Sequence, residues 1–172
     1  PDKLKNALNG LLNGNIYVKS VVEVPDTFHA RFDVKQKEYI YKINTGEYSP
    51  IYKDYIYQYC KPLDVDSMKT AIKSFEGEHN FKSFTKANVE TNNFTRTIYS
   101  TAVTKDNDII TIKFVGNGFM RYMVRNMVGF LIEIGEGKRN ISDVNSVLLE
   151  EDRTKAGKTA PPEGLYLNKV TY

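Results

Sequence analysis

A strongly apolar segment between Gly116 and Gly135 places the tightest constraint on the fold. Arg121 and Arg125 interrupt this segment four residues apart, so in a helix they would lie side by side at the edge of its apolar face. Three environments suit the pair: a carboxylate of the protein, a phosphate from outside, or apolar surface with the charged ends in water. The helix itself is predicted because apolar residues recur every three or four positions: Met120, Met123, Val124, Met127, Val128 and Leu131.

The composition is that of an ordinary globular protein. The chain has 172 residues, which is enough for one domain with a core or for two small ones, and 41% of them are hydrophobic and 26% charged. A net charge of +3 permits a nucleic-acid partner without requiring one. The single cysteine, Cys60, excludes an internal disulfide and fits a reducing cytoplasm. We find no membrane-spanning run or signal peptide, and a chain that begins with Pro1 suggests processing or a longer parent protein.

Helical and strand patterns follow one another along the chain. Asp64 or Asp66 is expected to cap one helix that Gly77 ends, and Ser142 is expected to cap another. Strands joined in hairpins, with helices between them, predict an α+β fold: a largely antiparallel sheet with helices on one face, forming a single domain over 1–172. The predicted elements are helices over 1–12, 63–77, 116–135 and 142–152, and strands over 16–24, 28–43 (interrupted in its middle), 55–60, 95–104, 109–115 and 165–172.

Several familiar motifs are excluded. Residues 156–159 read Ala-Gly-Lys-Thr, but a phosphate-binding loop requires a glycine where this chain has Asp152. His29 and His79 lack the spacing of metal ligands, and one cysteine is too few for a cysteine zinc site. No metal site is therefore expected.

Three segments, in this order, resemble the tRNA pseudouridine synthases of the TruA type. They are "FHARFDVKQKEYIYKI" (28–43), "GNGFMRYMVRNMVGFL" (116–131) and "DRTKAGKTAPPEGLYL" (152–167), with "GEHNFKSF" and "TRTI" between the first two. The resemblance extends over residues 21–172 and implies half of a pseudouridine synthase fold. It also implies isomerisation of uridine to pseudouridine in the anticodon stem-loop of tRNA, at positions 38 to 40, without a metal or organic cofactor. The uridine would be flipped out of its stack and attacked by an aspartate.

The resemblance assigns roles to individual residues. Tyr39 matches a tyrosine that stacks on the target base, Arg125 a basic residue that pairs with the catalytic aspartate, and Leu165 an apolar wall of the pocket. Without the resemblance, Tyr39 would be read as a half-buried strand residue and Leu165 as plain core. Asp152 and Arg153 match a pair suited to a structural ion pair. Residues implied to contact RNA are His29, Arg31, Arg96 and Arg121.

The nucleophile of the family lies in a "GRTDAG"-like stretch, and none of the aspartates of this chain follows Gly-Arg-Thr. We therefore expect the C-terminal part of a longer enzyme, inactive alone, with an exposed cleft where its N-terminal half docks. The resemblance further implies a cytoplasmic homodimer that shares a tRNA. Two alternatives remain: a non-catalytic RNA-binding module with the same fold, and an unrelated α+β domain whose arginines bind an internal carboxylate.

Overall fold

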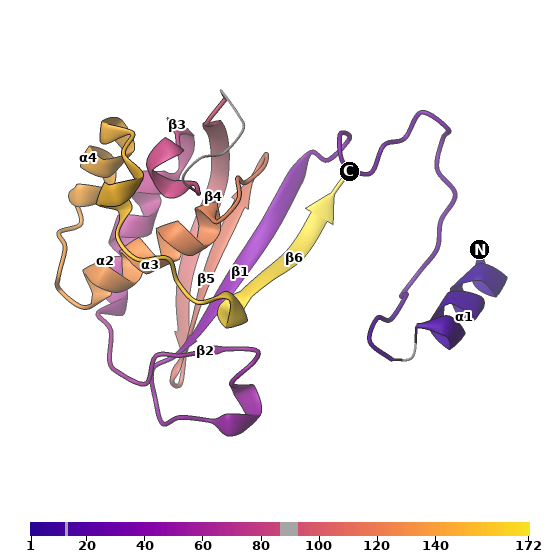
Figure 1. Ribbon diagram of the computed structural model, residues 1–172, viewed down its shortest axis with the longest axis horizontal. Coiled ribbons are helices and arrows are strands. Elements are labelled where there is room, and N and C mark those ends of the chain that lie inside the picture. The colour runs from indigo at the N-terminus through magenta and orange to yellow at the C-terminus, as the bar shows by residue number, and fades with distance from the viewer. Residues whose placement is uncertain (13, 87–92) are drawn as a thin grey trace. The chain divides into compact units, whose positions relative to one another are not determined.

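The computed structural model describes residues 1–12, 14–86 and 93–172 (Figure 1). The chain divides into two compact units, Pro1–Asp33 and Val34–Tyr172, and each is described by itself. The single domain expected over 1–172 stays a prediction. No helix in the described ranges has both the length and the apolar character needed to cross a membrane.

The first unit contains the predicted N-terminal helix but lacks the predicted strand. Helix α1 spans Asp2–Leu11, and none of its residues is buried. Residues 16–24 were expected to form a strand, and this prediction is wrong. A strand needs a neighbour for its N–H and C=O groups, and the described part of this unit offers no other strand. The segment is anchored to α1 by the Asn9 side chain, which makes two hydrogen bonds to the backbone of Val18 (3.0 and 2.7 Å).

The strand predicted over 28–43 forms only in its second half. Residues 28–33 make a turn instead, in which the Asp33 carboxylate accepts from the backbone N–H of His29 at 2.7 Å. Strand β1 follows as Gln36–Asn44. The interruption expected in the middle of this segment therefore falls where the turn ends.

Strand β1 has more neighbours than any other strand of a six-stranded sheet, since three strands pair with it (Figure 1). It pairs antiparallel with β5 and β6, and parallel with the short β2. The order β2-β1-β5-β4-β3, with β6 beside β1, is mostly antiparallel, which confirms the α+β class. The bounds of the other strands are β2 Tyr57–Gln58, β3 Gly77–Asn80, β4 Thr95–Asp106, β5 Ile109–Gly116 and β6 Leu165–Thr171.

The hairpin predicted around residues 105–108 is confirmed, since β4 and β5 are paired from Asp106 and Ile109 onward. Strand β6 is confirmed as well, whereas the strand predicted over 55–60 is reduced to two residues. Strand β3 was not predicted, because four residues without apolar alternation carry no strand signal.

Three helices cover one face of the sheet (Figure 1). They are α2 Val65–Ile72, α3 Met123–Gly135 and α4 Asp143–Glu150. Alternate strand residues face these helices and are completely buried, whereas the residues between them, such as Lys42 and Lys113, are partly exposed. Burial on one face only is what a half-covered antiparallel sheet requires. The buried strand residues are Tyr41, Ile43, Ile110, Ile112 and Phe114.

Helix α3 begins later than its apolar pattern predicts. Tyr122 has a left-handed backbone (φ 66°), which ends the preceding turn and delays the helix to Met123. Arg121 therefore lies before the helix, and the prediction that it shares a helical face with Arg125 is wrong. A positive φ at a tyrosine is uncommon, so the sequence pattern gave no warning of it.

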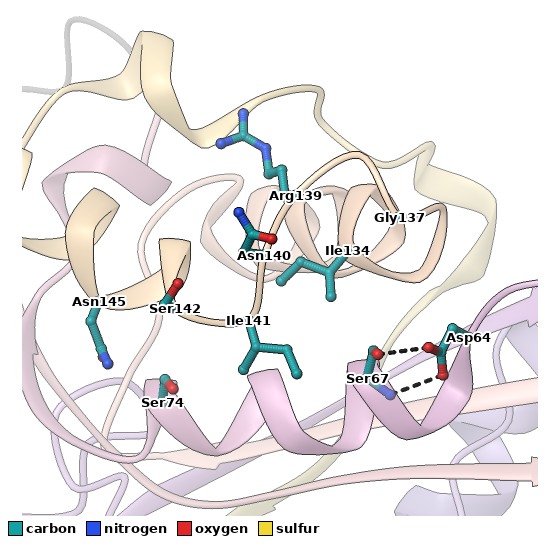
Figure 2. Close-up of a pocket in the computed structure, with 10 residues that line it drawn as sticks. All are labelled: Asp64, Ser67, Ser74, Ile134, Gly137, Arg139, Asn140, Ile141, Ser142 and Asn145. Atoms are coloured by element: carbon teal, nitrogen blue, oxygen red, sulfur yellow. Dashed lines mark hydrogen bonds between the residues drawn. The ribbon is translucent and has the colours of Figure 1, made fainter.

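Helix α2 is capped as predicted, by Asp64 rather than Asp66. The Asp64 carboxylate accepts from the backbone N–H of Asp66 at 3.1 Å. It also accepts from the backbone N–H (3.0 Å) and the hydroxyl (2.6 Å) of Ser67 (Figure 2). At α4 the predicted cap residue Ser142 is in place, but its hydroxyl makes no capping hydrogen bond.

The Asp64 cap should make the stability of the fold depend on pH in the acid range. Hydrogen bonds from Ser67, first from its hydroxyl and then from its N–H, lower the pKa of the Asp64 carboxyl. The ionised cap therefore stabilises folding above the ordinary aspartate pKa of about 4, and this contribution disappears as the pH falls through the lowered pKa of the folded state. Asp64→Asn, which caps without titrating, should unfold with a weaker acid dependence in urea titrations. Parallel stability curves for the two proteins would contradict this expectation.

Glycine at position 129 allows the chain around residue 158 to lie directly on α3. A Cβ at Gly129 would overlap the backbone carbonyl oxygen of Lys158, whereas one at Gly118 would meet only the Arg96 side chain at 3.8 Å. We expect Gly129→Ala to lower the free energy of unfolding by about 2 kcal/mol or more, although alanine favours a helix. Gly118→Ala is the matched control and should change it by less than about 0.5 kcal/mol. Urea denaturation measures both.

Candidate active site

A pocket of about 320 Å³ lies between the start of α3 and the paired strands β1 and β6. It contains Tyr39, Arg125 and Leu165, the three residues that the resemblance assigned to catalysis, together with Arg121. These residues are distant in sequence, so the fold is what brings them together. The remaining lining residues are Phe119, Met120, Tyr122, Met123, Val124 and Pro162.

Tyr39 supplies an aromatic ring on the helix-covered side of the sheet. In β1 it lies between Phe114 of β5 and Leu167 of β6, two residues before the buried Tyr41 and on the same face. Its ring meets the ring of Phe119 edge to face, with centroids 5.1 Å apart. Burial raises the pKa of the Tyr39 hydroxyl, which therefore stays neutral at ordinary pH. The exposed part of the ring provides a stacking surface in the pocket.

Arg125 is fixed in the first turn of α3 by a reciprocal contact with Ala160. Its Nε donates to the Ala160 carbonyl at 2.7 Å, and the Ala160 N–H donates to the Arg125 carbonyl at 3.0 Å. Among the residues that the structure describes, no carboxylate forms an ion pair with Arg125. An internal carboxylate partner, one of the three environments considered from the sequence, is therefore not found in the described chain.

Arg121 reaches the same pocket from the turn before α3. Its carbonyl accepts from the Lys86 N–H at 3.1 Å and from the Thr85 hydroxyl at 3.3 Å, which holds the turn in place. The Arg121 side chain is exposed, and its guanidinium carbon lies 5.5 Å from the centroid of the Tyr122 ring. The guanidinium of Arg125 lies 5.0 Å from the same ring. The two arginines thus share an aromatic neighbour, and this tyrosine was not singled out from the sequence.

The other three residues expected to contact RNA do not line this pocket. Arg96, on β4, donates through Nη1 to the carbonyls of Thr95 (2.6 Å) and Asn93 (3.3 Å). His29 and Arg31 belong to the first unit, where the His29 ring accepts from the Arg31 N–H at 3.1 Å. Their roles stay predictions.

Asp152 and Arg153 do not form the expected ion pair. Asp152 accepts from the N–H and hydroxyl of Thr154, both at 2.8 Å, and so caps the short 3-10 helix that follows. Arg153 turns inward, and its Nη2 donates to the Asn126 side-chain oxygen at 3.0 Å and to the Thr159 hydroxyl at 2.9 Å. Each of the two residues therefore makes its own structural contacts, and neither contact joins Asp152 to Arg153.

Asn126 is the centre of a polar network that the sequence did not reveal. It is completely buried, and its amide donates to the Phe84 carbonyl at 2.6 Å. Its side-chain oxygen accepts from Thr159 at 2.6 Å as well as from Arg153, which itself donates to the Gly157 carbonyl. The network fastens residues 157–160 to α3, and with them the carbonyl that orients Arg125. Its members are too far apart in sequence for any local pattern to indicate them.

A larger cavity, of about 640 Å³, lies elsewhere, between α2 and the residues that join α3 to α4 (Figure 2). Its charged groups are already engaged. Arg139 is paired with Glu133 at 2.5 Å and lies over the Phe130 ring at 4.4 Å, and Asp64 caps α2. Short polar side chains make up most of its remaining lining. Nor does the described part of the chain hold a cluster of His, Cys, Asp or Glu able to bind a metal.

The pocket beside α3 therefore defines the class of site. An aromatic ring, an apolar side chain and two arginines that form no ion pair with any described carboxylate suit a flat base joined to an anionic group, as in a nucleotide.

Comparison with known proteins agrees with this class. The family model described as tRNA pseudouridine synthase matches residues 71–172, more than half of the chain. Three similar proteins, each named tRNA pseudouridine synthase A, come from Geobacillus sp. (strain WCH70), Anoxybacillus flavithermus and Pseudothermotoga lettingae. They are 43%, 40% and 43% identical to this chain over 100%, 99% and 99% of its length, and the match covers 70%, 70% and 71% of theirs. The chain belongs to the tRNA pseudouridine synthase family.

Removing the Arg153 side chain should loosen residues 157–160 from α3. Arg153→Met loses the hydrogen bonds to Asn126, Thr159 and the Gly157 carbonyl, and we expect the free energy of unfolding to fall by about 1–3 kcal/mol. The Ala160 N–H should exchange with solvent about tenfold faster or more, measured by amide hydrogen exchange. The control is Lys155→Met on the same turn, whose side chain is 58% exposed and 4.0 Å from Glu150. Equal exchange rates in the two variants would contradict the assigned role of Arg153.

Proposed function

We propose that this chain is the part of a tRNA pseudouridine synthase that holds the target uridine, and that it acts with a carboxylate from outside residues 1–172. One observation carries the proposal: Tyr39, Arg125 and Leu165 line one pocket, and Arg125 forms no ion pair with a described carboxylate.

The reaction rearranges one nucleotide. The bond from C1′ of the ribose to N1 of the base breaks, a bond from C1′ to C5 forms, C5 loses its proton and N1 gains one. The atoms balance without an oxidant or a reductant, and the proposal includes no cofactor. Because the base must leave its stack, the pocket has to replace the stacking energy. Tyr39 offers a ring face for this purpose, and Leu165 offers an apolar wall that keeps water from the base.

In this proposal Arg125 is the partner of the nucleophilic carboxylate. A guanidinium stays charged at all relevant pH values and binds a carboxylate through two parallel hydrogen bonds. Such a pair keeps the pKa of the carboxyl low, so that the group is ionised and ready to attack. Since Nε is bound to Ala160, the two terminal nitrogens are the ones available to the carboxylate. We place this carboxylate in a segment beyond residues 1–172, and expect 1–172 alone to be inactive.

The substrate we propose is the anticodon stem-loop of tRNA, modified at positions 38 to 40, with the enzyme acting as a cytoplasmic homodimer. Exposed Arg121 at the pocket would contact a phosphate near the target uridine. Arg96, His29 and Arg31 would contact the RNA backbone further away. The printed names of the relatives support tRNA as the substrate, and the finer assignment rests on the resemblance in sequence.

Arg125 is the residue to test in the full-length protein. We expect Arg125→Met to lower pseudouridine formation about 100-fold or more, and Arg125→Lys to restore little, because an ammonium lacks the planar fork. Tritium release from tRNA labelled at C5 of uridine measures turnover. The control is Lys69→Met on α2, an exposed lysine 2.9 Å from Asp66, which should leave turnover unchanged.

Turnover of Arg125→Met close to that of the unchanged protein would remove the role given to this residue. Salt-sensitive tRNA binding without tritium release by the unchanged full-length protein would favour the alternative, a non-catalytic RNA-binding module.

A further inference from the structure

Tyr122 occupies a backbone position that suits a different residue. The Met123 N–H donates to the Met120 carbonyl at 3.1 Å and closes a four-residue turn, of which Tyr122 is the third residue. Its φ of 66° and ψ of −3° lie in the left-handed region, where turns of this kind favour glycine or asparagine. A bulky side chain there is strained, and such strain is often found at functional sites. The backbone alone therefore does not account for a tyrosine at this position.

The contacts of the side chain do account for it. The guanidinium carbon of Arg125 lies 5.0 Å from the centroid of the Tyr122 ring, and that of Arg121 lies 5.5 Å from it. Both distances fall within the range of cation–π attraction. Tyr122 also lines the pocket and is 38% exposed, so it is accessible to whatever enters.

The ring completes the fixation of Arg125. The hydrogen bond from Nε to the Ala160 carbonyl holds one edge of the guanidinium at 2.7 Å, but a single bond still lets the planar group swing about it. Contact with the flat ring limits this movement, because the attraction acts on a charge that lies over the face of the ring. The terminal nitrogens, for which no described residue forms an ion pair, are then held in one orientation at the pocket.

We propose that Tyr122 is a positioning residue for the synthase reaction, an inference that rests on the proposed function. Its ring holds the guanidinium of Arg125 toward the incoming carboxylate and that of Arg121 toward a tRNA phosphate. The left-handed backbone is what directs the ring to this place at the entrance of α3. Tyr122 itself takes no part in bond making or breaking.

The positive φ of Tyr122 makes it possible to test this role apart from a purely structural one. Tyr122→Gly and Tyr122→Asn suit a positive φ better than tyrosine does, so both should fold with an unfolding temperature equal to or above that of the unchanged protein. Both remove the ring, and we expect kcat to fall about tenfold or more, because small misplacements of catalytic groups are costly. The KM for tRNA should change much less. Tyr122→Phe keeps the ring, and since the Tyr122 hydroxyl has no hydrogen bond to any residue that the structure describes, this variant should retain turnover.

The experiment uses the full-length protein, with tritium release and thermal unfolding measured for all three variants. Loss of kcat in the glycine and asparagine variants, with phenylalanine near the unchanged value, supports the proposal. Turnover near the unchanged value in Tyr122→Asn or Tyr122→Gly overturns it, and so does an equal loss in Tyr122→Phe, which would point to the hydroxyl. Absence of turnover in the unchanged protein is a different result, since it contradicts the proposed function itself.

Discussion

The reciprocal contact between Arg125 and Ala160 is the interaction on which the site depends. One hydrogen bond joins their backbones and another joins the Arg125 side chain to the Ala160 carbonyl, so helix α3 and the chain leading into β6 hold each other in place. Close approach is possible because Gly129 leaves room for the Lys158 carbonyl. From this anchor the chain runs through Pro161, whose carbonyl accepts from the Tyr41 hydroxyl at 2.6 Å, and then into the pocket wall. The same contacts therefore determine how residues 158–160 pack on α3 and how the Arg125 side chain is oriented.

The electrostatics of the pocket are unfavourable in isolation. Arg125 lies in the first turn of α3, where the helix dipole already favours negative charge, and Arg121 immediately precedes that helix. Two cations placed there destabilise the protein slightly until an anion arrives. Binding of the proposed carboxylate and phosphate would therefore gain energy from relieving this unfavourable arrangement of charges.

Sequence patterns identified the elements that depend on local interactions. The hairpin of β4 and β5, the capped helix α2 and strand β6 all carry their signals within a few residues. The strand expected over 16–24 failed because pairing depends on a distant neighbour that a local pattern does not reveal. Similarly, the late start of α3 depends on one backbone angle at Tyr122.

Only part of the candidate site could be predicted, and that part came from a family resemblance rather than from local sequence patterns. Tyr39, Arg125 and Leu165 came from resemblance to a family, since a strand tyrosine and a strand leucine have no distinguishing pattern of their own. The fold explains why they meet: Tyr39 and Leu165 lie on neighbouring strands, and Arg125 enters from the helix above them. The network around Asn126 and Arg153 could not be predicted, because it joins groups 27 residues apart through side chains.

The pairing of β1 with β6 has a consequence for how this pocket could change. Leu165 lies opposite Tyr41, and Leu167 opposite Tyr39, with an irregularity in the pairing between Glu38 and Tyr39. Side chains alternate between the two faces of a sheet, so inserting or deleting one residue between Leu165 and Leu167 would move Leu165 to the opposite face. Loss of Asn168, the extra residue at the irregularity, would instead leave both pairings in place. The apolar wall of the pocket therefore depends on the register of β6 against β1 as well as on side-chain size. A change of length between these two leucines would therefore alter the pocket even if every residue that lines it were kept.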